Sequence, residues 1–557
     1  MIAIYIVSGL KTWLKNLKNL FLQYRSCANA VIIPFILVCS IGTLYWLTMP
    51  KTLSWGWRGY GIDSPELITA AKYFSVPHPP GYPFYTGMLG LFSNVFSIGD
   101  YALRGNLFSL ILSCLCVLVT YMIGESLLRH LYPTNHNINT RIVAFLGAIT
   151  LAVAPIYWSV SVVTEVYTLH CLLVAIQVYL GILLILKWHL RKQVNSILLT
   201  CLFIAFAIGL SNHLTILAFT VPIVAVLLFN VPLRLLVRPV PLLIASIFLL
   251  IYLYLPLRSS AEVPFNWGDS GNLQGFLWML RAAPYQDYVM AAPISELDDR
   301  ALIFVKFIFD QFNVIGLFFT AVGIKVLVTK NKPLILMVAT TFLLLFVYSI
   351  TYLTVDAEVN FIPVFIYFSI CSSIGIMEIF KTVQKSVQNI GEKHGKFHLP
   401  ILVGILTFVL YFAFVPGFNS VSKYEELDFS KDEAALKNGR DILANVSAKD
   451  ILIVSSEKDV FTSWYAIYTD SEVNTGIPIA EPLLVYDWYI KRAVLTEFPS
   501  FEKTYSSNDI LDVISEIIEH SDRRGSKVFT IRPIVDDRFS LDMVSDGMYL
   551  LANKVQE

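Results

Sequence analysis

About eleven apolar stretches, each long enough to cross a lipid bilayer, run through the first three quarters of the chain. Their approximate centres are residues 40, 116, 151, 176, 203, 222, 249, 319, 343, 369 and 408. A bilayer core of about 30 Å requires about 20 apolar residues in a helix. Hydrophobic residues make up 56% of the 557 and charged residues 15%, which is too apolar for a soluble protein of this length. We therefore predict an α-helical multi-pass membrane protein with about 11 transmembrane helices.

Positive residues indicate how these helices are oriented. They precede the first stretch and then collect in every second loop: Lys11, Lys15, Lys18, Arg25; Arg129, Arg141; Lys187, Arg191, Lys192; Arg234, Arg238; Lys325, Lys330, Lys332; Lys381, Lys385, Lys393 and Lys396. Since positive loops stay in the cytoplasm, we expect a cytoplasmic N terminus and a C terminus outside. Residues 1–29 lack the compact apolar run of a signal peptide, and we expect a cytoplasmic basic amphipathic segment there.

The chain after residue 416 has a different pattern. Segments 450–454, 527–531 and 548–551 resemble strands, segment 508–520 has helical apolar spacing, and the charged run 455–459 is typical of a loop. We predict a transmembrane domain at 30–416, with its first outer loop at 51–103, and a small extracytoplasmic α/β domain at 417–557. The formal net charge of +0 and the absence of a glycine-rich phosphate loop give no support for nucleic acid or nucleotide binding.

The first outer loop carries the most unusual polar residues. Asp63 and Glu66 are three positions apart, so on a helical turn both carboxylates could face one cavity and share a proton, a metal ion or a substrate hydroxyl. The prolines between residues 77 and 83 exclude helix and central strand, and they would hold His78 and Tyr82 in a rigid loop. The structural alternative is that Asp63 simply caps a short interfacial helix.

Further polar residues fall at the outer ends of apolar stretches or in outer loops. They are Glu165, His170, Asn212, His213, Arg258, Trp267, Asp269, Asp356 and Glu358. Ionisable groups at the edge of a membrane are costly unless they are paired or hydrated, so this one-sided distribution predicts a shared aqueous cavity. Arg258 could bind a phosphate through its planar fork of donors, or it could mark the membrane boundary. Trp267 could stack on a sugar, or it could be an interfacial anchor.

Several sequence blocks resemble the transmembrane protein 260 family. The blocks are 63–71 and 78–83 (DSPELITAA and HPPGYP), followed in the same order by 165–170, 211–215, 254–258, 266–268 and 355–358. Pro65 departs from the pattern, because many relatives carry glycine at that position. The family includes an endoplasmic reticulum protein O-mannosyltransferase and is similar to GT-C glycosyltransferases. The resemblance implies a GT-C-like membrane enzyme that transfers a sugar from a polyprenyl-phosphate-linked donor to an acceptor hydroxyl on the non-cytoplasmic face.

The resemblance also implies roles for individual residues. Asp63 would be the general base of an inverting displacement, with Glu66 as a second catalytic acid. The expected substrate-binding residues are His78, Tyr82, Glu165, Arg258, Trp267 and Asp356. No cofactor is firmly implied, although Asp63 and Glu66 could together hold Mg²⁺ or Mn²⁺. The expected partners are the lipid bilayer, the lipid-linked donor and a protein or glycan acceptor.

The sequence also allows two alternative functions and indicates a cellular location. A transporter or flippase of a lipid-linked or anionic substrate could use the same polar cavity, but it predicts charges on both faces and two related halves. A non-catalytic membrane scaffold would instead depend on the C-terminal domain. The absence of cysteine after residue 371 favours a bacterial plasma membrane over a eukaryotic lumen.

Overall fold

The computed structural model describes residues 30–133, 138–394, 399–470, 476–499, 510–545 and 547–554. The predicted basic segment 1–29 lies outside these residues. The apolar helices are Ala30–Thr48, α4 (Tyr101–Leu131), α5 (Ile138–Ala152), α6 (Pro155–Ser161), α7 (Tyr167–Arg191), α8 (Ser196–Leu210), α9 (Leu217–Asn230), α11 (Pro239–Leu249), α12 (Tyr254–Ser259), α14 (Leu297–Lys330), α15 (Lys332–Thr351), α16 (Phe365–His394) and α17 (Leu399–Phe412).

Among the described residues, seven helices are long and apolar enough to cross a membrane, or up to eight if one bent pair forms a single span. That pair is α5 and α6, which meet at a 72° bend where Pro155 opens the second helix. All eleven predicted centres fall in apolar helices, which confirms an integral multi-pass membrane protein. The count of eleven spans is not confirmed, because α8, α9 and the helix Leu406–Ser422 are shorter.

The helices differ in how much surface they leave available to lipid. The most apolar window of the span Ala357–Val387 is 94% buried inside the protein, whereas that of Ala30–Thr48 is 17% buried and that of Pro239–Ser259 is 11% buried. The span Ala357–Val387 therefore forms the centre of the helical domain, packed by α14, α5 and α4. The other two spans lie at its periphery, where apolar side chains face a bilayer.

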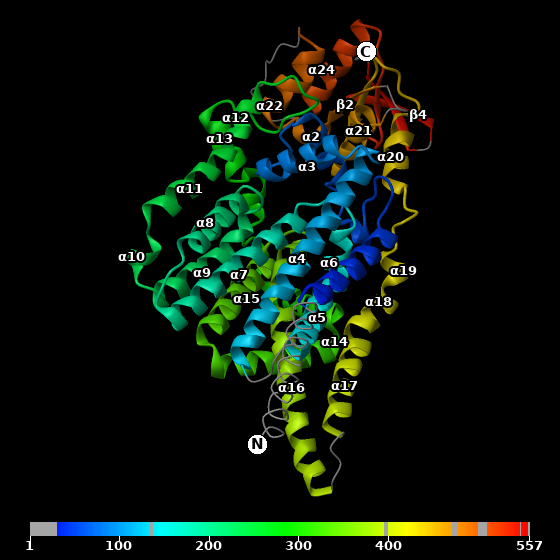
Figure 1. Cartoon of the computed structure of the whole chain (residues 1–557). Helices are drawn as coiled ribbons and strands as arrows, with labels where there is room; N and C mark the ends of the chain where they lie inside the picture. The colour runs from blue at the N-terminus through cyan, green and yellow to red at the C-terminus, as the bar shows by residue number, and fades with distance from the viewer. Residues whose placement is uncertain are drawn as a thin grey trace, which may run out of the picture.

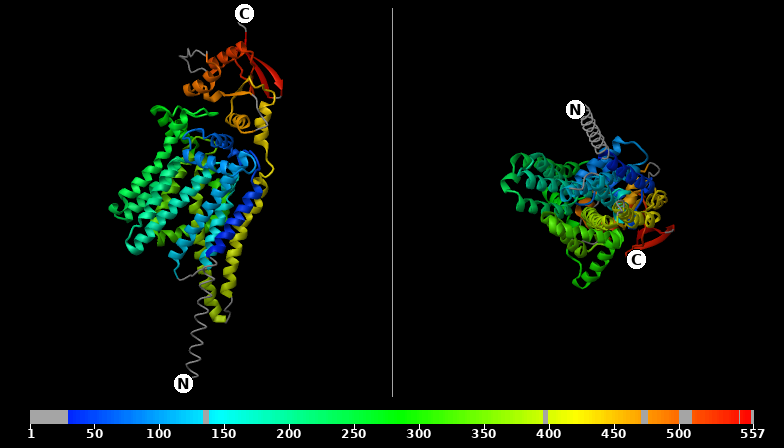
Figure 2. Two further views of the ribbon diagram at one scale, coloured as in Figure 1. Left: turned by 45° about the horizontal axis from the view of Figure 1, so that its top comes forward. Right: turned by 60° about the horizontal axis from the view of Figure 1, so that its bottom comes forward.

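Short helices gather at one end of the helical domain. The helices α2 (Ser64–Tyr73), α3 (Pro83–Val95) and α13 (Leu273–Leu280) lie at the end nearest the C-terminal sheet, as Figures 1 and 2 show. The last turns of α16 and the start of α17 lie at the opposite end. The loops that carry the unusual polar residues of the sequence are thus collected on one side.

The C-terminal region contains a five-stranded sheet, which confirms the predicted small α/β domain. Its strands are β1 (Ile451–Val454), β2 (Ile477–Ala480), β3 (Val528–Thr530), β4 (Phe539–Ser545) and β5 (Met548–Asn553). The order is β2-β1-β3-β5-β4, with β1 parallel to β2 and β3 and the remaining pairs antiparallel. All four residues of β1 are buried, as expected for a strand with parallel neighbours on both sides.

One local prediction in this domain is wrong. The charged run 455–459 is not a loop, because α21 begins at Glu457 and extends to Tyr468. Ser456 caps the helix by accepting a hydrogen bond from the backbone N–H of Asp459 at 3.2 Å. The charged residues therefore occupy the first turn of a helix that packs against α2. The domain boundary at residue 417 stays a prediction.

Candidate functional site

Asp63 lies at the start of α2, and its carboxylate makes no hydrogen bond to the described residues. Its backbone carbonyl accepts the first hydrogen bond of the helix, from Leu67 N–H at 2.9 Å, but its side chain makes no capping bond. Ser64 holds this end of the helix through a 2.7 Å hydrogen bond to the carbonyl of Thr164. The simple capping role considered for Asp63 is therefore not what the side chain does. Its side chain keeps 34% exposure at the end of a helix that is otherwise largely buried.

Both carboxylate oxygens of Glu66 bond to His78. The Glu66 side chain is fully buried, and Oε2 lies 2.5 Å from His78 Nδ1. The other oxygen accepts the backbone N–H of His78 at 3.0 Å. Both carboxylate oxygens thus fix the orientation of one imidazole, and the second ring nitrogen, Nε2, lies 2.9 Å from Tyr82 Oη and 3.7 Å from Asp63 Oδ2.

The proline loop supports this arrangement as the sequence predicted. A hydrogen bond of 2.8 Å from Gly81 N–H to the carbonyl of His78 closes the turn. Tyr82 adopts a left-handed conformation with φ 39° directly before Pro83 opens α3. Such a conformation is unusual for a residue with a side chain and often occurs at a functional site. It leaves the Tyr82 hydroxyl beside His78.

The charges of Asp63 and His78 influence each other. Burial raises the pKa of Asp63 to about 6; the His78 charge opposes this rise, while Glu66 and Asp356 add to it. Burial lowers the pKa of His78, but the carboxylates of Glu66 and Asp63 more than compensate and raise it to about 10. At neutral pH the site therefore holds an imidazolium beside an ionised Asp63.

Three further carboxylates share this electrostatic environment. Burial raises the pKa of Glu165 well above its ordinary value, and Asp63 adds to the rise. Burial also raises the pKa of Glu457 to about 7, and Asp63 adds to that rise. The name acidic cluster is used below for Asp63, Glu66, Glu165, Asp356 and Glu457. Asp356 interacts electrostatically with Asp63, and the other four interact with His78.

Glu457 is the member that the sequence reasoning missed. It comes from α21 in the C-terminal domain, nearly four hundred residues after Asp63. One feature of the sequence could have indicated Glu457. The residue follows a buried parallel strand, and ligand sites of parallel sheets lie at the carboxyl ends of their strands. Tyr285 was also missed; its ring packs against His78 with centroids 6.2 Å apart.

Of two further predicted residues, Arg258 acts differently and Trp267 lies at the site. Arg258 donates to the carbonyls of Phe74 at 2.6 Å and Tyr73 at 2.9 Å, so its fork caps the end of α2. Trp267 does lie beside the cluster, with its ring centroid 6.2 Å from that of His78. Its backbone is joined to the loop before His78, because Trp267 N–H donates to Val76 O at 3.0 Å.

The geometry does not suit a metal ion held by Asp63 and Glu66. Both oxygens of Glu66 already accept bonds from His78. Across the residues that the structure describes, no group of three or more His, Cys, Asp or Glu side chains is arranged to hold a metal. We therefore derive no step through a metal ion.

A pocket of about 510 Å³ is lined in part by Val355 and Ala357, which flank Asp356 of the acidic cluster, and it carries four cations, two of them already engaged. This basic pocket is lined by Arg58, Arg300, Lys306 and Lys423, together with Asp310 and Glu358. Arg300 donates to the carbonyls of Ile350 and Tyr352, and Lys423 pairs with Glu426 at 2.6 Å. Within the described chain, Arg58 and Lys306 take part in no ion pair.

Comparison with known proteins connects this site to a family. The model of the family described as "Protein O-mannosyl-transferase TMEM260 N-terminal domain" matches residues 63–235, which begin at Asp63. The protein O-mannosyl-transferase tmem260 of Dictyostelium discoideum is 23% identical over 524 residues, or 85% of this chain and 59% of that protein. TMEM260 of Mus musculus is 30% identical over 261 residues, or 45% of this chain and 34% of that protein. The chain thus spans well under two thirds of the length of these relatives.

Solved structures show the fold. ArnT from Cupriavidus metallidurans in the apo state has a TM-score of 0.57 at 10% identity, covering 96% of this chain and 98% of ArnT. The structure of ArnT bound to undecaprenyl phosphate has a TM-score of 0.53 at 9% identity, covering 94% and 97% of the two chains. The GT-C-like fold is confirmed over nearly the whole chain. The resemblance to the transmembrane protein 260 family is likewise confirmed, because residues 63–235 match the model of its N-terminal domain.

Proposed function

We propose that this protein is a membrane glycosyltransferase that moves a sugar from a polyprenyl-phosphate-linked donor to an acceptor hydroxyl, with inversion at the anomeric carbon. The observation that carries the proposal is the free, accessible carboxylate of Asp63 beside a fixed imidazolium, at the first residue of a domain shared with O-mannosyl-transferases. The undecaprenyl phosphate bound to ArnT, which shares this fold, supports a polyprenyl-phosphate carrier. Mannose transfer to a protein hydroxyl is the option that the curated relatives favour.

Asp63 is the general base of the proposed reaction. Its carboxylate takes the proton of the acceptor hydroxyl as that oxygen attacks the anomeric carbon and the bond to the carrier phosphate breaks. With a pKa of about 6, Asp63 is ionised at neutral pH yet is a stronger base than an ordinary aspartate. A single displacement of this kind needs no enzyme nucleophile and inverts the centre.

Glu66 and His78 position and tune that base. Glu66 holds the ring through two bonds, and the resulting cation lies 3.7 Å from Asp63, where it favours the ionised carboxylate. Glu66 has no free oxygen for substrate, so it acts through His78 rather than as a second acid. The proposed binding residues for the sugar or the acceptor are Tyr82, Glu165 and Asp356.

The basic pocket is the proposed site of the carrier phosphate. The phosphate gains negative charge as the glycosidic bond breaks, and Arg58 and Lys306 supply positive charge. Ile303, Phe304 and Phe307 of the same pocket lie on α14, a helix long enough to cross a membrane, which suits a carrier whose chain stays in lipid. Arg258 is not carried forward for this role, because its fork is occupied by backbone carbonyls.

The proposed orientation follows from the positive loops. The acidic cluster and the sheet domain lie on the non-cytoplasmic side, and the N terminus lies in the cytoplasm. The proposed location is a bacterial plasma membrane.

The test is a donor assay with purified full-length protein. Polyprenyl-phosphate sugars that differ in the sugar are offered together with hydroxyl acceptors, and consumption of each donor is measured. We expect one donor to be consumed by the wild type and not by Asp63→Asn. The matched control is Asp298→Asn, an exposed aspartate at the start of α14, which should keep the wild-type rate. Equal transfer by Asp63→Asn and wild type would remove the assigned base.

A further inference from the structure

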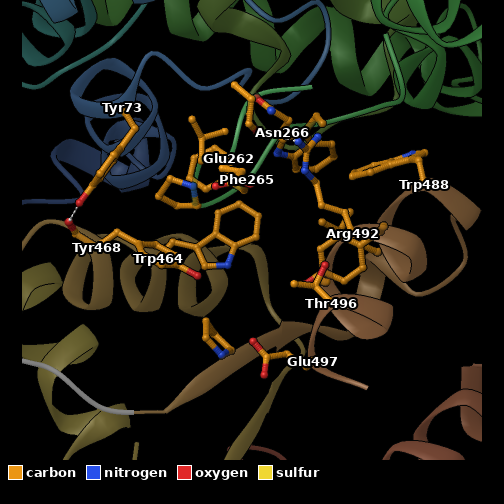
Figure 3. A pocket seen from close by; sticks show the side chains of 18 of the residues that line it. Tyr73, Glu262, Phe265, Asn266, Trp464, Tyr468, Trp488, Arg492, Thr496 and Glu497 are labelled. Atoms are coloured by element: carbon orange, nitrogen blue, oxygen red, sulfur yellow. Dashed lines mark hydrogen bonds between the residues drawn. The ribbon is translucent and has the colours of Figure 1, made fainter. Parts of the chain in front are cut away.

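A second pocket, of about 760 Å³, lies where the helical domain meets the sheet domain. We call it the aromatic pocket, because its walls include Tyr73, Phe265, Trp267, Trp464, Tyr468 and Trp488 (Figure 3). Its volume is typical of a small-molecule site. None of the roles proposed above uses it, apart from Trp267, which forms part of its wall.

Contacts between the two domains hold the walls in place. Phe265 stacks on Trp464 with ring centroids 4.4 Å apart. The hydroxyl of Tyr73 donates to the carbonyl of Tyr468 at 2.7 Å, the dashed bond in Figure 3. Arg492 donates from Nη2 to the carbonyls of Ser259 at 2.9 Å and Ala261 at 3.0 Å. The pocket is therefore preformed, which lowers the entropy that a ligand must lose to order it.

Two indole N–H groups of the pocket wall have no acceptor. Nε1 of Trp267 and Nε1 of Trp488 are both buried and make no hydrogen bond within the described part of the chain. A buried indole N–H usually finds a partner, since leaving it unpaired is costly. Because neither Nε1 atom has accessible surface, a ligand in the pocket would contact the rings and the carboxylates of its walls rather than these two N–H groups.

The charges of the pocket favour a neutral ligand over an anionic one. Two carboxylates, Glu262 and Glu497, line it, and its guanidinium, Arg492, donates from Nη2 to carbonyls. Because the two negative charges outnumber the single positive charge, we assign the carrier phosphate to the basic pocket. Carboxylates instead accept hydrogen bonds from hydroxyl groups.

We propose that the aromatic pocket binds a neutral saccharide unit of the acceptor. This inference rests on the proposed function and selects a glycan acceptor over the protein hydroxyl that the curated relatives favour. A pyranose has apolar C–H faces that pack on aromatic rings, and hydroxyls that donate to carboxylates. Trp267 contacts His78 on one side and Trp488 on the other, with centroids 6.2 Å and 5.9 Å apart. The bound unit thus lies one indole away from the acidic cluster.

Binding without a donor tests this proposal. Isothermal titration of the full-length protein in nanodiscs uses neutral mono- and disaccharides of mannose, glucose, galactose and N-acetylglucosamine. A proline-rich peptide is titrated in parallel, because such peptides also dock on aromatic-lined grooves. We expect a saccharide to bind the wild type, and Trp488→Phe, which replaces the indole by a smaller ring and so reduces the stacking surface, to bind it roughly tenfold more weakly. The control is Trp46→Phe, an exposed indole on the helix Ala30–Thr48, which should bind like the wild type.

The outcomes separate this proposal from the proposed function. Saccharide binding that persists in Asp63→Asn supports the pocket, because it does not require the base. The absence of saccharide binding, binding of the peptide alone, or unchanged affinity in a folded Trp488→Phe variant would each overturn it. Saccharide binding in a protein that consumes no lipid-linked donor would count against the proposed function and leave the pocket assignment intact.

Discussion

The acidic cluster and the aromatic pocket are built in opposite ways although they share a wall. The cluster gathers five acidic side chains near one imidazolium, which buried hydrogen bonds to Glu66 hold in place. The pocket has two carboxylates and one guanidinium, and most of its walls are aromatic rings. The difference indicates a division between chemistry and recognition, because a cluster of charges suits proton transfer whereas aromatic rings suit a bound neutral ligand.

The two regions also depend on the C-terminal domain in different ways. The cluster takes one carboxylate from it, Glu457, while its base and imidazole come from the first outer loop. The pocket takes several of its rings from that domain and could not exist without it. Damage to α21 or to residues 483–497 should therefore affect recognition more than proton transfer.

The largest predicted effect tests the chemical region. Replacement of Asp63 by Asn removes the base and should lower the single-turnover transfer rate about 10³-fold. Thermal unfolding should change little, because the side chain makes no capping bond and is partly exposed. A rate within tenfold of the wild type would show that another group accepts the proton.

Glu66→Gln should have the next largest effect, and it acts on stability as well as on rate. The substitution leaves His78 buried beside a neutral partner, so we expect a loss of about 3 kcal/mol of unfolding free energy. We also expect a roughly 10- to 100-fold slower transfer, since the ring would no longer be fixed. Chemical denaturation and transfer assays measure both. Glu519→Gln is the matched control, because the pair of Glu519 and Arg523 is exposed and should contribute little.

A smaller effect separates the two arginines considered for the carrier phosphate. Arg58→Ala combined with Lys306→Ala should raise the donor KM about tenfold, because two charges of the basic pocket are lost. Arg258→Lys should leave the donor KM unchanged and lower the Tm, since it loses the fork that caps α2. A raised donor KM in Arg258→Lys, with an unchanged donor KM in the double variant, would instead assign binding of the carrier phosphate to Arg258.

The sequence predicted the membrane helices well because hydropathy is a local property. Each expected centre falls in an apolar helix. The number of spans was harder to predict, because a run of apolar residues does not reveal a 72° bend or a helix that stops after fifteen residues.

Within the site, the sequence predicted contacts between residues that are close along the chain, but not contacts between distant ones. The spacing of Asp63 and Glu66 predicted that their carboxylates lie close together, and both lie beside His78 in the proline loop. Spacing could not reveal that Glu66 is sealed, that Arg258 meets the end of a helix about 185 residues earlier, or that Glu457 joins from another domain. Those facts depend on tertiary packing, which no local pattern encodes.

The most direct test of the account is the pH dependence of single-turnover transfer between pH 5 and 8. The rate should rise with pH and level off with a midpoint near the Asp63 pKa of about 6, while His78, with a pKa of about 10, stays charged throughout. His78→Gln removes a charge that lowers the Asp63 pKa, so its midpoint should move to higher pH. Asp356→Asn removes a charge that raises the Asp63 pKa, so the midpoint of this variant should move to lower pH. Opposite shifts in these two variants are the predicted result, and a profile that is flat in the wild type or unmoved in both variants would contradict Asp63 as the base.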